Sequence, residues 1–360
     1  MEYRLAGLLL VGALLAGCAS PTPPASTTSA PFRGETLTIL DHGAFAAFED
    51  AKRLFENATG ATVVHVSTDD SGAMLQRAIQ EKGDPTFDVL YGIDNILWTK
   101  AAAAGVFTPY EPAGADAIPR EYVFFEGPWL ATPVDHGYIG VNVDAATLGA
   151  NVTTLDGLRA HAGEFVTEDP RTSTPGLGFL LATIATYGED GWQGYWEQLF
   201  ANGALVTRGW TEAYEQHFSA GYGVDQGGAG DRAIVTSYTE SPAYEAFFGR
   251  PADKLATPIV APNSTFHEVQ TMGIANGTKH EALAKRWIEF TLTPEFQALA
   301  APGNAVYPVM GGTDTNATYG TFDPEPGTFA PADMPADRIG ANLERWLRGW
   351  TDLCEQHDCA

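Results

Sequence analysis

A regular alternation of strand-like and helix-like segments constrains the fold of this chain more than any other feature of its sequence. Apolar segments typical of short strands lie at 37–40, 62–66 and 87–92, and each precedes a segment with helical spacing, at 45–57, 72–82 and 95–104. Such alternation predicts an α/β protein with a mainly parallel sheet, whose ligands bind beyond the carboxyl ends of the strands. His42, Asp70, Ser71 and Asp94 follow predicted strand ends, so they are candidates for a site.

The same alternation continues to the C-terminus. Further strands are predicted at 165–167, 205–207 and 233–237, and helices at 153–162, 192–200, 211–219, 282–292, 294–300 and 336–352. The chain has 360 residues, which is enough for two domains of ordinary size.

The N-terminus has the pattern of a signal peptide. Residues 5–16 form an apolar core that is too short to span a membrane, and residues 15–18 (LAGC) are similar to a lipoprotein cleavage box that ends at Cys18. An ordinary cleaved signal is the alternative. Residues 19–34 are rich in Pro, Ser and Thr, which predicts a disordered tether. Either way, we expect the domain to work outside the cell membrane.

The chain is strongly acidic. It carries a formal net charge of −25, from 45 acidic residues against 20 Lys and Arg. Such a surface repels nucleic acid and anionic membranes, so we expect no nucleic-acid partner. The charge favours either a cationic ligand or solubility in high salt, and it does not choose between them.

Besides Cys18, the cysteines are Cys354 and Cys359, close to the C-terminus. Outside the cell, two such thiols indicate a disulfide that closes a small terminal loop. A metal site that also uses His357 is the alternative, but two thiols and one imidazole do not fill a tetrahedral shell. We therefore predict no metal site.

Residues 169–178, with the sequence DPRTSTPGLG, contain a strong helix-start signal. Hydroxyl residues that include Ser173 and Thr174 precede Pro175, and the apolar run 179–185 follows with helical spacing. The free N–H groups of such a helix terminus, together with the hydroxyls, form a small nest that can bind an anion or a hydroxyl group. An ordinary capped helix is the alternative.

Two later segments accompany this loop. Residues 209–214 read GWTEAY and residues 237–244 read SYTESPAY. Together the three segments resemble the thiamine-binding subunit of ABC importers, a family of bilobal periplasmic substrate-binding proteins. In that family the segments PRTSTPGLG, GW(S/T)EAY and SYTTSPAY occur in this order at similar spacing. Within these segments the chain departs only at Glu240, and a weaker likeness extends over about 37–350.

The resemblance implies a two-lobe α/β fold of the type II periplasmic-binding-protein kind, with mainly parallel sheets, flanking helices and a hinge. The chain would cross into the second lobe at 132–143 and return near 258–262. Cys18 would become a lipidated N-terminus, and the partner would be an ABC transporter permease. We expect a monomer without a cofactor. The implied divisions are 1–18 for the signal peptide, 19–34 for the tether, 35–132 and 262–350 for the first lobe, 133–261 for the second lobe, and 351–360 for a C-terminal tail.

The resemblance also implies a ligand. Thiamine combines a permanently cationic thiazolium ring, a flat aminopyrimidine and a hydroxyethyl arm that can carry phosphate, so its site needs aromatic faces, a carboxylate and donors. By resemblance, Trp210, Tyr238 and Tyr244 form aromatic walls, and Ser173 with Thr174 faces the arm. The other polar candidates are Ser241 and, from the opposite lobe, Asp70, Ser71 and Asp94.

Structural alternatives stay open for some of these residues. Asp94 can simply cap its helix, and Ser241 can bond to backbone beside Pro242. Tyr138 and Tyr214 are expected to pack between the lobes rather than to touch a ligand.

The first lobe departs from the family at two positions. His42 stands where the family commonly has a tyrosine, and its smaller ring has a charge that depends on pH, so a protonated His42 would repel a thiazolium. Ala305 stands where the family often has a tryptophan, so one indole wall is absent. In the second lobe, a glycine-rich segment at 220–230 is longer than usual, and we interpret it as a surface insertion.

The sequence thus predicts a non-catalytic binding protein that closes around thiamine or its phosphates and delivers them to a permease. One alternative is a binding protein for another cationic solute, such as ferric ion, a polyamine or another heterocycle. Ferric sites in related folds favour adjacent tyrosines, and the chain has no Tyr-Tyr pair. A thiaminase-like enzyme is the other alternative, but its cysteine nucleophile would have to lie in the cleft, and no cysteine lies between Cys18 and Cys354.

Overall fold

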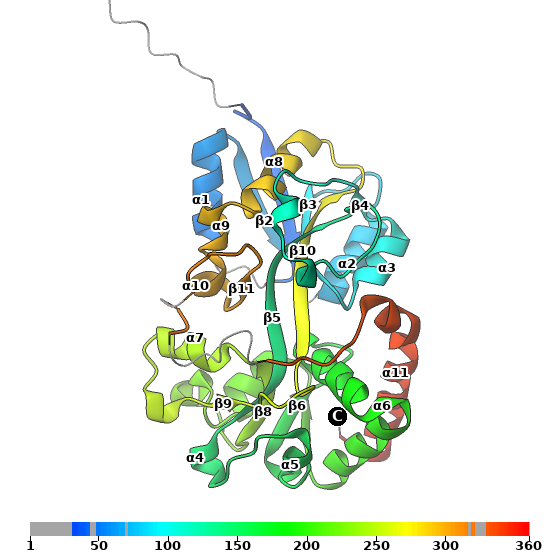
Figure 1. Ribbon diagram of the computed structural model, residues 1–360, viewed down its shortest axis with the longest axis vertical. Coiled ribbons are helices and arrows are strands. Elements are labelled where there is room, and N and C mark those ends of the chain that lie inside the picture. The colour runs from blue at the N-terminus through cyan, green and yellow to red at the C-terminus, as the bar shows by residue number, and fades with distance from the viewer. Residues whose placement is uncertain (1–30, 44–47, 69–70, 316–317, 321–328, 360) are drawn as a thin grey trace, which may run out of the picture.

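The computed structural model describes residues 31–43, 48–68, 71–315, 318–320 and 329–359. Asp70, Cys18 with the predicted signal peptide, and most of the predicted tether lie outside these residues. The described chain forms two α/β lobes that are stacked along the long axis of the molecule (Figure 1). None of the helices in this part has both the length and the apolar character that crossing a membrane requires.

One mixed sheet runs through both lobes. Its strands in the described chain are β1 (Thr36–Asp41), β2 (Thr62–Ser67), β3 (Val89–Asp94), β4 (Phe107–Thr108), β5 (Thr132–Val143), β6 (Phe165–Glu168), β7 (Leu205–Thr207), β8 (Ile234–Tyr238), β9 (Thr257–Pro258), β10 (Phe266–Ala275) and β11 (Tyr307–Pro308). The order is β2-β1-β3-β10-β5-β8-β6-β7, with β4 on β10 and with β9 and β11 on β5. Within the first lobe β1 is parallel to β2 and β3, and within the second lobe β6 is parallel to β7 and β8.

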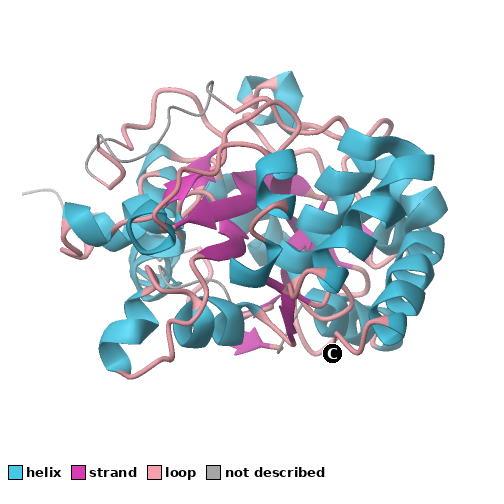
Figure 2. Ribbon diagram, turned by 90° about the horizontal axis from the view of Figure 1, so that it is seen from below, coloured by secondary structure: helices cyan, strands magenta, loops and turns pink. Residues whose placement is uncertain are grey.

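Helices lie around the strands, as the view from below shows (Figure 2). The first lobe contains α1 (Phe48–Thr59), α2 (Ser71–Gln80), α3 (Trp98–Ala104), α8 (Glu281–Thr291), α9 (Pro294–Gln297) and α10 (Ala300–Asn304). The second lobe contains α4 (Ala145–Leu148), α5 (Leu155–Arg159), α6 (Thr174–Ala201) and α7 (Ser241–Phe247). Shorter helical turns are η1 (Ala115–Ala117), η2 (Arg120–Tyr122), η3 (Ala162–Glu164) and η6 (Ala252–Lys254).

The helices form because their apolar residues repeat on one face. In α1 the buried side chains include Phe48, Ala51 and Phe55, spaced three and four residues apart, as a helix packed on a sheet requires. Phe55 meets Trp287 of α8 edge to face, with ring centroids 4.9 Å apart. Most of the strands and helices predicted from the sequence are therefore observed, with shifts of a few residues at element ends. The sequence does not predict β10 or α7, and the helix predicted at 294–300 is divided into α9 and α10.

Two long antiparallel strands, β5 and β10, connect the lobes (Figure 1). All residues of β5 are buried, and it pairs with β10 and, in the second lobe, with β8. The outward crossing lies at the predicted position. The return was expected near 258–262, but the return strand begins only at Phe266, because Thr257–Pro258 adds a short strand to β5 first and a turn closed by Ser264 follows. The Ser264 hydroxyl donates to the Ala261 carbonyl at 2.6 Å.

The C-terminal helix, α11 (Ala336–Gln356), packs on both lobes, which differs from the predicted divisions. The sequence assigns 262–350 to the first lobe and leaves 351–360 as a tail. In the structure Thr99 of α3 donates its hydroxyl to the carbonyl of Ala336 (3.1 Å), whereas Trp350 enters the second-lobe core, 5.8 Å from the Trp196 ring. The apolar stripe of α11 continues to Cys354, and the helix ends at Gln356 rather than at the predicted residue 352.

The glycine-rich segment at 220–230 is more than the surface insertion expected from the sequence. It forms a 3-10 helix, η5 (Tyr222–Gln226), which packs on the π-helical turn η4 (Glu212–His217), where an ordinary helix was predicted. A Cβ added at Gly223 would lie 2.2 Å from the carbonyl oxygen of Glu215, so this approach requires glycine. The packing brings Tyr222, Asp225 and Gln226 to the cavity described below.

Candidate functional site

A cavity of about 1440 Å³ is lined by residues of both lobes. It lies where strands β1, β6, β7 and β8 end, which is the position that the sheet topology predicts for a ligand site. Eight of the predicted binding residues line it: His42, Ser71, Ser173, Thr174, Trp210, Tyr238, Ser241 and Tyr244. Of the other two, Asp70 lies outside the described residues, and Asp94 does not line the cavity.

The start of α6 forms one wall. Ser173 is the N-cap, as predicted, and its hydroxyl accepts from the Gly176 amide at 3.4 Å. A Cβ at Gly176 would lie 2.4 Å from the Glu168 carbonyl oxygen, so glycine lets the first turn sit against the end of β6. The half-buried hydroxyls of Ser173 and Thr174 and the open N–H groups of this turn can bind an anionic or hydroxyl group.

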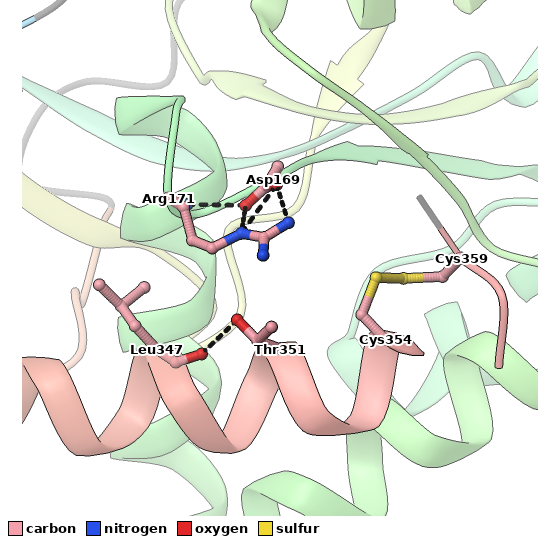
Figure 3. The surroundings of a disulfide bond; sticks show 6 residues. All are labelled: Asp169, Arg171, Leu347, Thr351, Cys354 and Cys359. Atoms are coloured by element: carbon pink, nitrogen blue, oxygen red, sulfur yellow. Dashed lines mark hydrogen bonds and ion pairs between the residues drawn. A yellow bond between two sulfur atoms is a disulfide. The ribbon is translucent and has the colours of Figure 1, made fainter. Parts of the chain in front are cut away.

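The C-terminal helix supports this wall from behind (Figure 3). Asp169 accepts from the Arg171 amide (2.8 Å) and pairs with its guanidinium (2.6 Å). The same guanidinium lies 5.8 Å from the ring of Trp350 in α11. Cys354 and Cys359 form a disulfide close by, at the end of that helix. The loop that carries Ser173 is thus held by a charge pair and by the C-terminal helix.

The indole of Trp210 is held from two sides. It stacks on Tyr214, with centroids 4.8 Å apart and planes 16° from parallel. Its Nε1 donates to Ser237 Oγ at 2.8 Å, and Ser237 Oγ lies 3.1 Å from Ser241 Oγ. Ser241 therefore extends this hydrogen-bond chain rather than bonding to backbone beside Pro242. The ring of Trp210 stays partly exposed to the cavity.

The expectation that Tyr214 packs between the lobes is wrong. Tyr214 is buried within the second lobe, against Trp210 and Phe218, and it also lines the cavity. Tyr138 does lie at the junction of the lobes, on β5, where its ring stacks on His267 of β10 at 4.9 Å.

Two tyrosines complete the second-lobe wall. Tyr238 ends β8, and burial together with nearby carboxylates, Glu268 first among them, raises its pKa well above the ordinary value. Tyr244 in α7 donates its hydroxyl across the cleft to the carbonyl of Pro302 in α10, at 3.3 Å. Phe248 meets Tyr244 edge to face at 4.9 Å and also lines the cavity.

The first-lobe wall is made of single residues from separate elements. His42 Nε2 lies 3.3 Å from Gln270 Oε1 of β10. The ring of His42 fits over Gly92, where a Cβ would lie 2.2 Å from His42 Cδ2. Asn304 donates to the hydroxyl of Tyr91 at 3.1 Å, and Ala305, which also lines the cavity, adopts a left-handed φ of 54°.

Asp94 takes the capping role that the sequence left open. Its Oδ1 accepts from the amides of Ile96 (3.0 Å) and Leu97 (2.8 Å), and the residue is only 2% exposed. It orders the turn before α3 and lies below the cavity rather than in its wall.

Sequence reasoning missed several lining residues. Tyr91 and Gln270 sit inside buried strands, where core packing is the ordinary expectation, so their local sequence gives no signal of a site. Glu245 and Arg250 form a pair at 3.0 Å on the outer side of the cavity, and burial raises the pKa of Glu245. The S-P-A-Y segment ends just before Glu245, but its spacing says nothing about that residue.

Among the described residues, no group of three or more His, Cys, Asp or Glu is arranged to hold a metal ion. The cavity instead offers aromatic faces, hydroxyls and amides, which suit a flat organic molecule with polar arms.

Curated relatives match almost the whole chain. It is 29% identical over 337 residues to a protein named thiamine-binding periplasmic protein from Escherichia coli, covering 90% of this chain and 94% of the relative. Proteins of the same name from Salmonella typhimurium and Brucella suis are 28% and 27% identical, over 94% and 88% of this chain and 96% and 91% of theirs.

Solved structures share the fold. A structure titled periplasmic thiamin binding protein superposes with a TM-score of 0.74 at 26% identity, over 89% of this chain and 98% of that one. An iron-bound protein, HitA from Pseudomonas aeruginosa, gives 0.71 at 16% identity over 89% and 99%, and that likeness concerns the fold alone. The expected two-lobe fold of the type II periplasmic binding proteins is thereby confirmed. Residues 37–301 match the sequence profile described as bacterial extracellular solute-binding protein, and the chain belongs to that family.

Proposed function

We propose that this protein captures thiamine, or a thiamine phosphate, in the cavity between its lobes and delivers it to an ABC transporter. The proposal rests on one observation above all. Trp210, Tyr238 and Tyr244 come from three separate segments of the second lobe, and all three line one cavity together with the start of α6. The relatives of similar length that are named for thiamine support it.

The site offers what each part of thiamine needs. A cation over an aromatic face gains about 0.5–2 kcal/mol, more where water is excluded, and the indole of Trp210 is available for the thiazolium. Ser173 and Thr174 would donate to the hydroxyethyl arm, or to its phosphate at the N-terminus of α6. From the first lobe, Ser71 and the His42–Gln270 pair would complete the polar contacts.

Delivery would use closure of the lobes. The strands β5 and β10 connect them, and Tyr244 already reaches from α7 to Pro302 in α10. A ligand that contacts both walls binds the closed arrangement more tightly than the open one and so favours closure. The permease would then bind the closed arrangement.

The family and the predicted signal peptide both support a location outside the cell membrane. We propose that the signal peptide is cleaved before Cys18, which removes residues 1–17, that Cys18 becomes the N-terminus and carries lipid, and that 19–34 tether the two-lobe domain, as a monomer, to the outer face of the cell membrane. Mass spectrometry of the N-terminal peptide from the native membrane fraction tests this. A mature chain that begins after an unmodified cleavage site would contradict the lipid anchor.

We further propose that the protein binds without catalysis. A thiaminase-like reaction needs a cysteine in the cleft, and the residues that line this cavity include none. Recovery of intact thiamine after long incubation is the expected result, and fragments of the vitamin would contradict it.

Isothermal titration tests the function directly. We expect saturable binding of thiamine, its monophosphate or its diphosphate at one site per chain. Absence of heat with all three, combined with binding of a polyamine or ferric ion, would remove the proposal. Mass spectrometry of the ligand that co-purifies with the native protein gives an independent answer.

A further inference from the structure

Buried carboxyl groups lie directly beneath the cavity. The strand register places Gln270 of β10 opposite Asp94 of β3 on one side and opposite Asp135 of β5 on the other. Residues opposite each other in a sheet share a face, and so do residues two apart in a strand, which adds Glu268. Gln270 lines the cavity and these three acidic side chains do not, so they lie beneath the part of the floor that Gln270 forms. We call them the floor carboxyls.

A fourth carboxyl joins the group from the second lobe. Glu268 is opposite Gly137 in the register, and a Cβ at Gly137 would lie 3.1 Å from Glu240 Oε1. The same Oε1 accepts from the amide of Tyr138 at 2.8 Å. Glu240 therefore sits beside Glu268, at the position where the sequence departs from its otherwise familiar segment.

The floor carboxyls are almost completely removed from water. Asp94 is 2%, Asp135 3% and Glu268 4% exposed. Asp135 accepts from the hydroxyl of Tyr91, and its other oxygen, Oδ1, has no hydrogen-bond partner among the described residues. Burial of such an oxygen next to a large cavity lowers the stability of the protein, unless a positive group comes near it or the carboxyl keeps a proton.

Burial and mutual repulsion keep protons on this floor. Burial, followed by the charge of Asp94, raises the pKa of Glu268 well above its ordinary value, and burial raises the pKa of Asp94. Burial also raises the pKa of Asp135 to about 7. Near neutral pH, at least one of the floor carboxyls is therefore protonated when the site is empty. A cation bound nearby would lower the pKa of that carboxyl and favour loss of the proton.

The groups around the floor compensate its charge only in part. The charge of His42, at the end of β1, lowers the pKa of Asp94, but burial has the larger effect. The neutral phenol of Tyr238 faces Glu268, Asp94 and the buried carboxyl Glu168 from β8. On the opposite face of β5 and β10, His136 and His267 lie 3.1 Å apart. Burial lowers the pKa values of both histidines, so both are neutral near pH 7.

We propose that the floor carboxyls recognise the positive charge of the ligand, and that binding of the cation expels a proton from them into solvent. This inference rests on the proposed function and adds the residues that select a cation over a neutral molecule of the same shape. In the step, a cationic ligand and a neutral carboxyl become a bound cation and a carboxylate, and the proton goes to the buffer. The low dielectric of the floor makes this coupling stronger than it would be in water.

The direction of the pH effect follows. Because binding releases a proton, the affinity rises with pH until the floor is already ionised in the free protein. Release of one full proton gives about a tenfold gain in affinity per pH unit, and partial release gives proportionately less.

Titration calorimetry on the purified protein measures the release directly. Thiamine is titrated near pH 7 in two buffers with different ionisation enthalpies, and the difference in heat gives the number of protons released. We expect a value between about 0.3 and 1 proton per thiamine. Deazathiamine, the uncharged thiophene isostere, should bind more weakly and release none.

Three variants identify the source of the proton. Glu268→Gln and Asp135→Asn should each reduce the release and flatten the dependence of affinity on pH, while His42→Gln should leave the release in place. Circular dichroism checks that each variant folds, and the wild-type measurement stands even if one does not. Thiamine binding with no proton released, or a release that only His42→Gln abolishes, would overturn the inference. Failure of thiamine to bind at all would instead overturn the proposed function, and this inference with it.

Discussion

The two lobes build their halves of the cavity in different ways. The second lobe supplies the segments 172–175, 208–214 and 238–251, which follow the ends of β6, β7 and β8, and η5 adds Tyr222, Asp225 and Gln226. The first lobe supplies fewer residues, from separate elements: 42–43 after β1, Ser71 at the start of α2, Tyr91 in β3, Gln270 in β10 and 304–306 at the end of α10. The second-lobe half is made mainly of contiguous segments, and the first-lobe half is made mainly of residues that lie far apart in the sequence.

The difference shows where binding energy is expected to lie. In the second lobe Trp210, stacked on Tyr214 and bonded to Ser237, is fixed before any ligand arrives. In the first lobe the His42–Gln270 contact is long, at 3.3 Å. A preorganised wall loses less entropy on binding. We therefore expect the second lobe to hold the ligand in the open protein and the first lobe to add to it on closure.

The strongest test of this asymmetry is Trp210→Ala. Loss of the stacked indole should cost about 2–3 kcal/mol of binding free energy, or roughly 30- to 140-fold in the dissociation constant for thiamine. Trp210→Phe is the matched control, since it keeps a ring over Tyr214 but loses the bond to Ser237, and it should recover most of the affinity. Titration calorimetry measures both. An unchanged constant for the alanine variant would place the ligand elsewhere.

A second test concerns the strands that join the lobes. Burial lowers the pKa of His267 to about 4, whereas the unfolded chain binds that proton at the ordinary value near 6.5. Between these values the unfolded state binds more protons, so stability falls as the pH falls, by about 2–3 kcal/mol for this residue. His267→Gln should lose less stability than the wild type between about pH 7 and pH 4, as urea unfolding can measure. If the unfolding free energies of the two proteins change in parallel with pH, His267 does not control this loss of stability.

The first-lobe counterpart of the tryptophan test is His42→Ala. Because His42 is a small ring held by one long contact, its removal should cost only about 0.5–1 kcal/mol, or two- to fivefold in thiamine affinity. The comparison with Trp210→Ala, in the same calorimeter and buffer, decides whether the walls are unequal. Equal losses from the two variants would remove the asymmetry.

The smallest effect should come from the rim of the second lobe. Phe248 is 67% exposed and lines the cavity, while its neighbour Phe247, 42% exposed, does not. Phe248→Ala should weaken thiamine binding by about 0.5 kcal/mol, roughly twofold, and Phe247→Ala is the control that should change nothing. If both substitutions had the same effect, the rim would act through folding of α7 rather than through contact with the ligand.

The same contrast explains what the sequence can predict. The strand and helix alternation and the capped start of α6 at Ser173 were predictable because each depends on local pattern, whereas the outward crossing at 132–143 came from the resemblance to a family. Trp210 and Tyr238 stand in contiguous motifs, so a resemblance identifies them. Such a resemblance also indicated the altered first-lobe position at His42.

Other features depend on contacts that no local pattern reveals. Gln270 reaches the cavity only because β10 lies between β3 and β5 in the sheet. In the sequence, β10 is about 170 residues from β3 and about 130 residues from β5. The floor carboxyls are brought together in the same way, and α11 joins the second lobe because its indoles fit the core around Trp196. The glycines at 220–230 indicate a loop, but the close approach of Gly223 to Glu215 that makes it part of the wall requires coordinates.

A crystal structure of the protein with thiamine tests the central claim most directly. The account predicts the cation in the cavity between the lobes, with its thiazolium against Trp210, its remaining rings or arm near Tyr238, Tyr244 and Ser173, and its charge above Asp135 and Glu268. A ligand bound outside this cavity, or inside it without contact to any of the three aromatic side chains, would contradict the account.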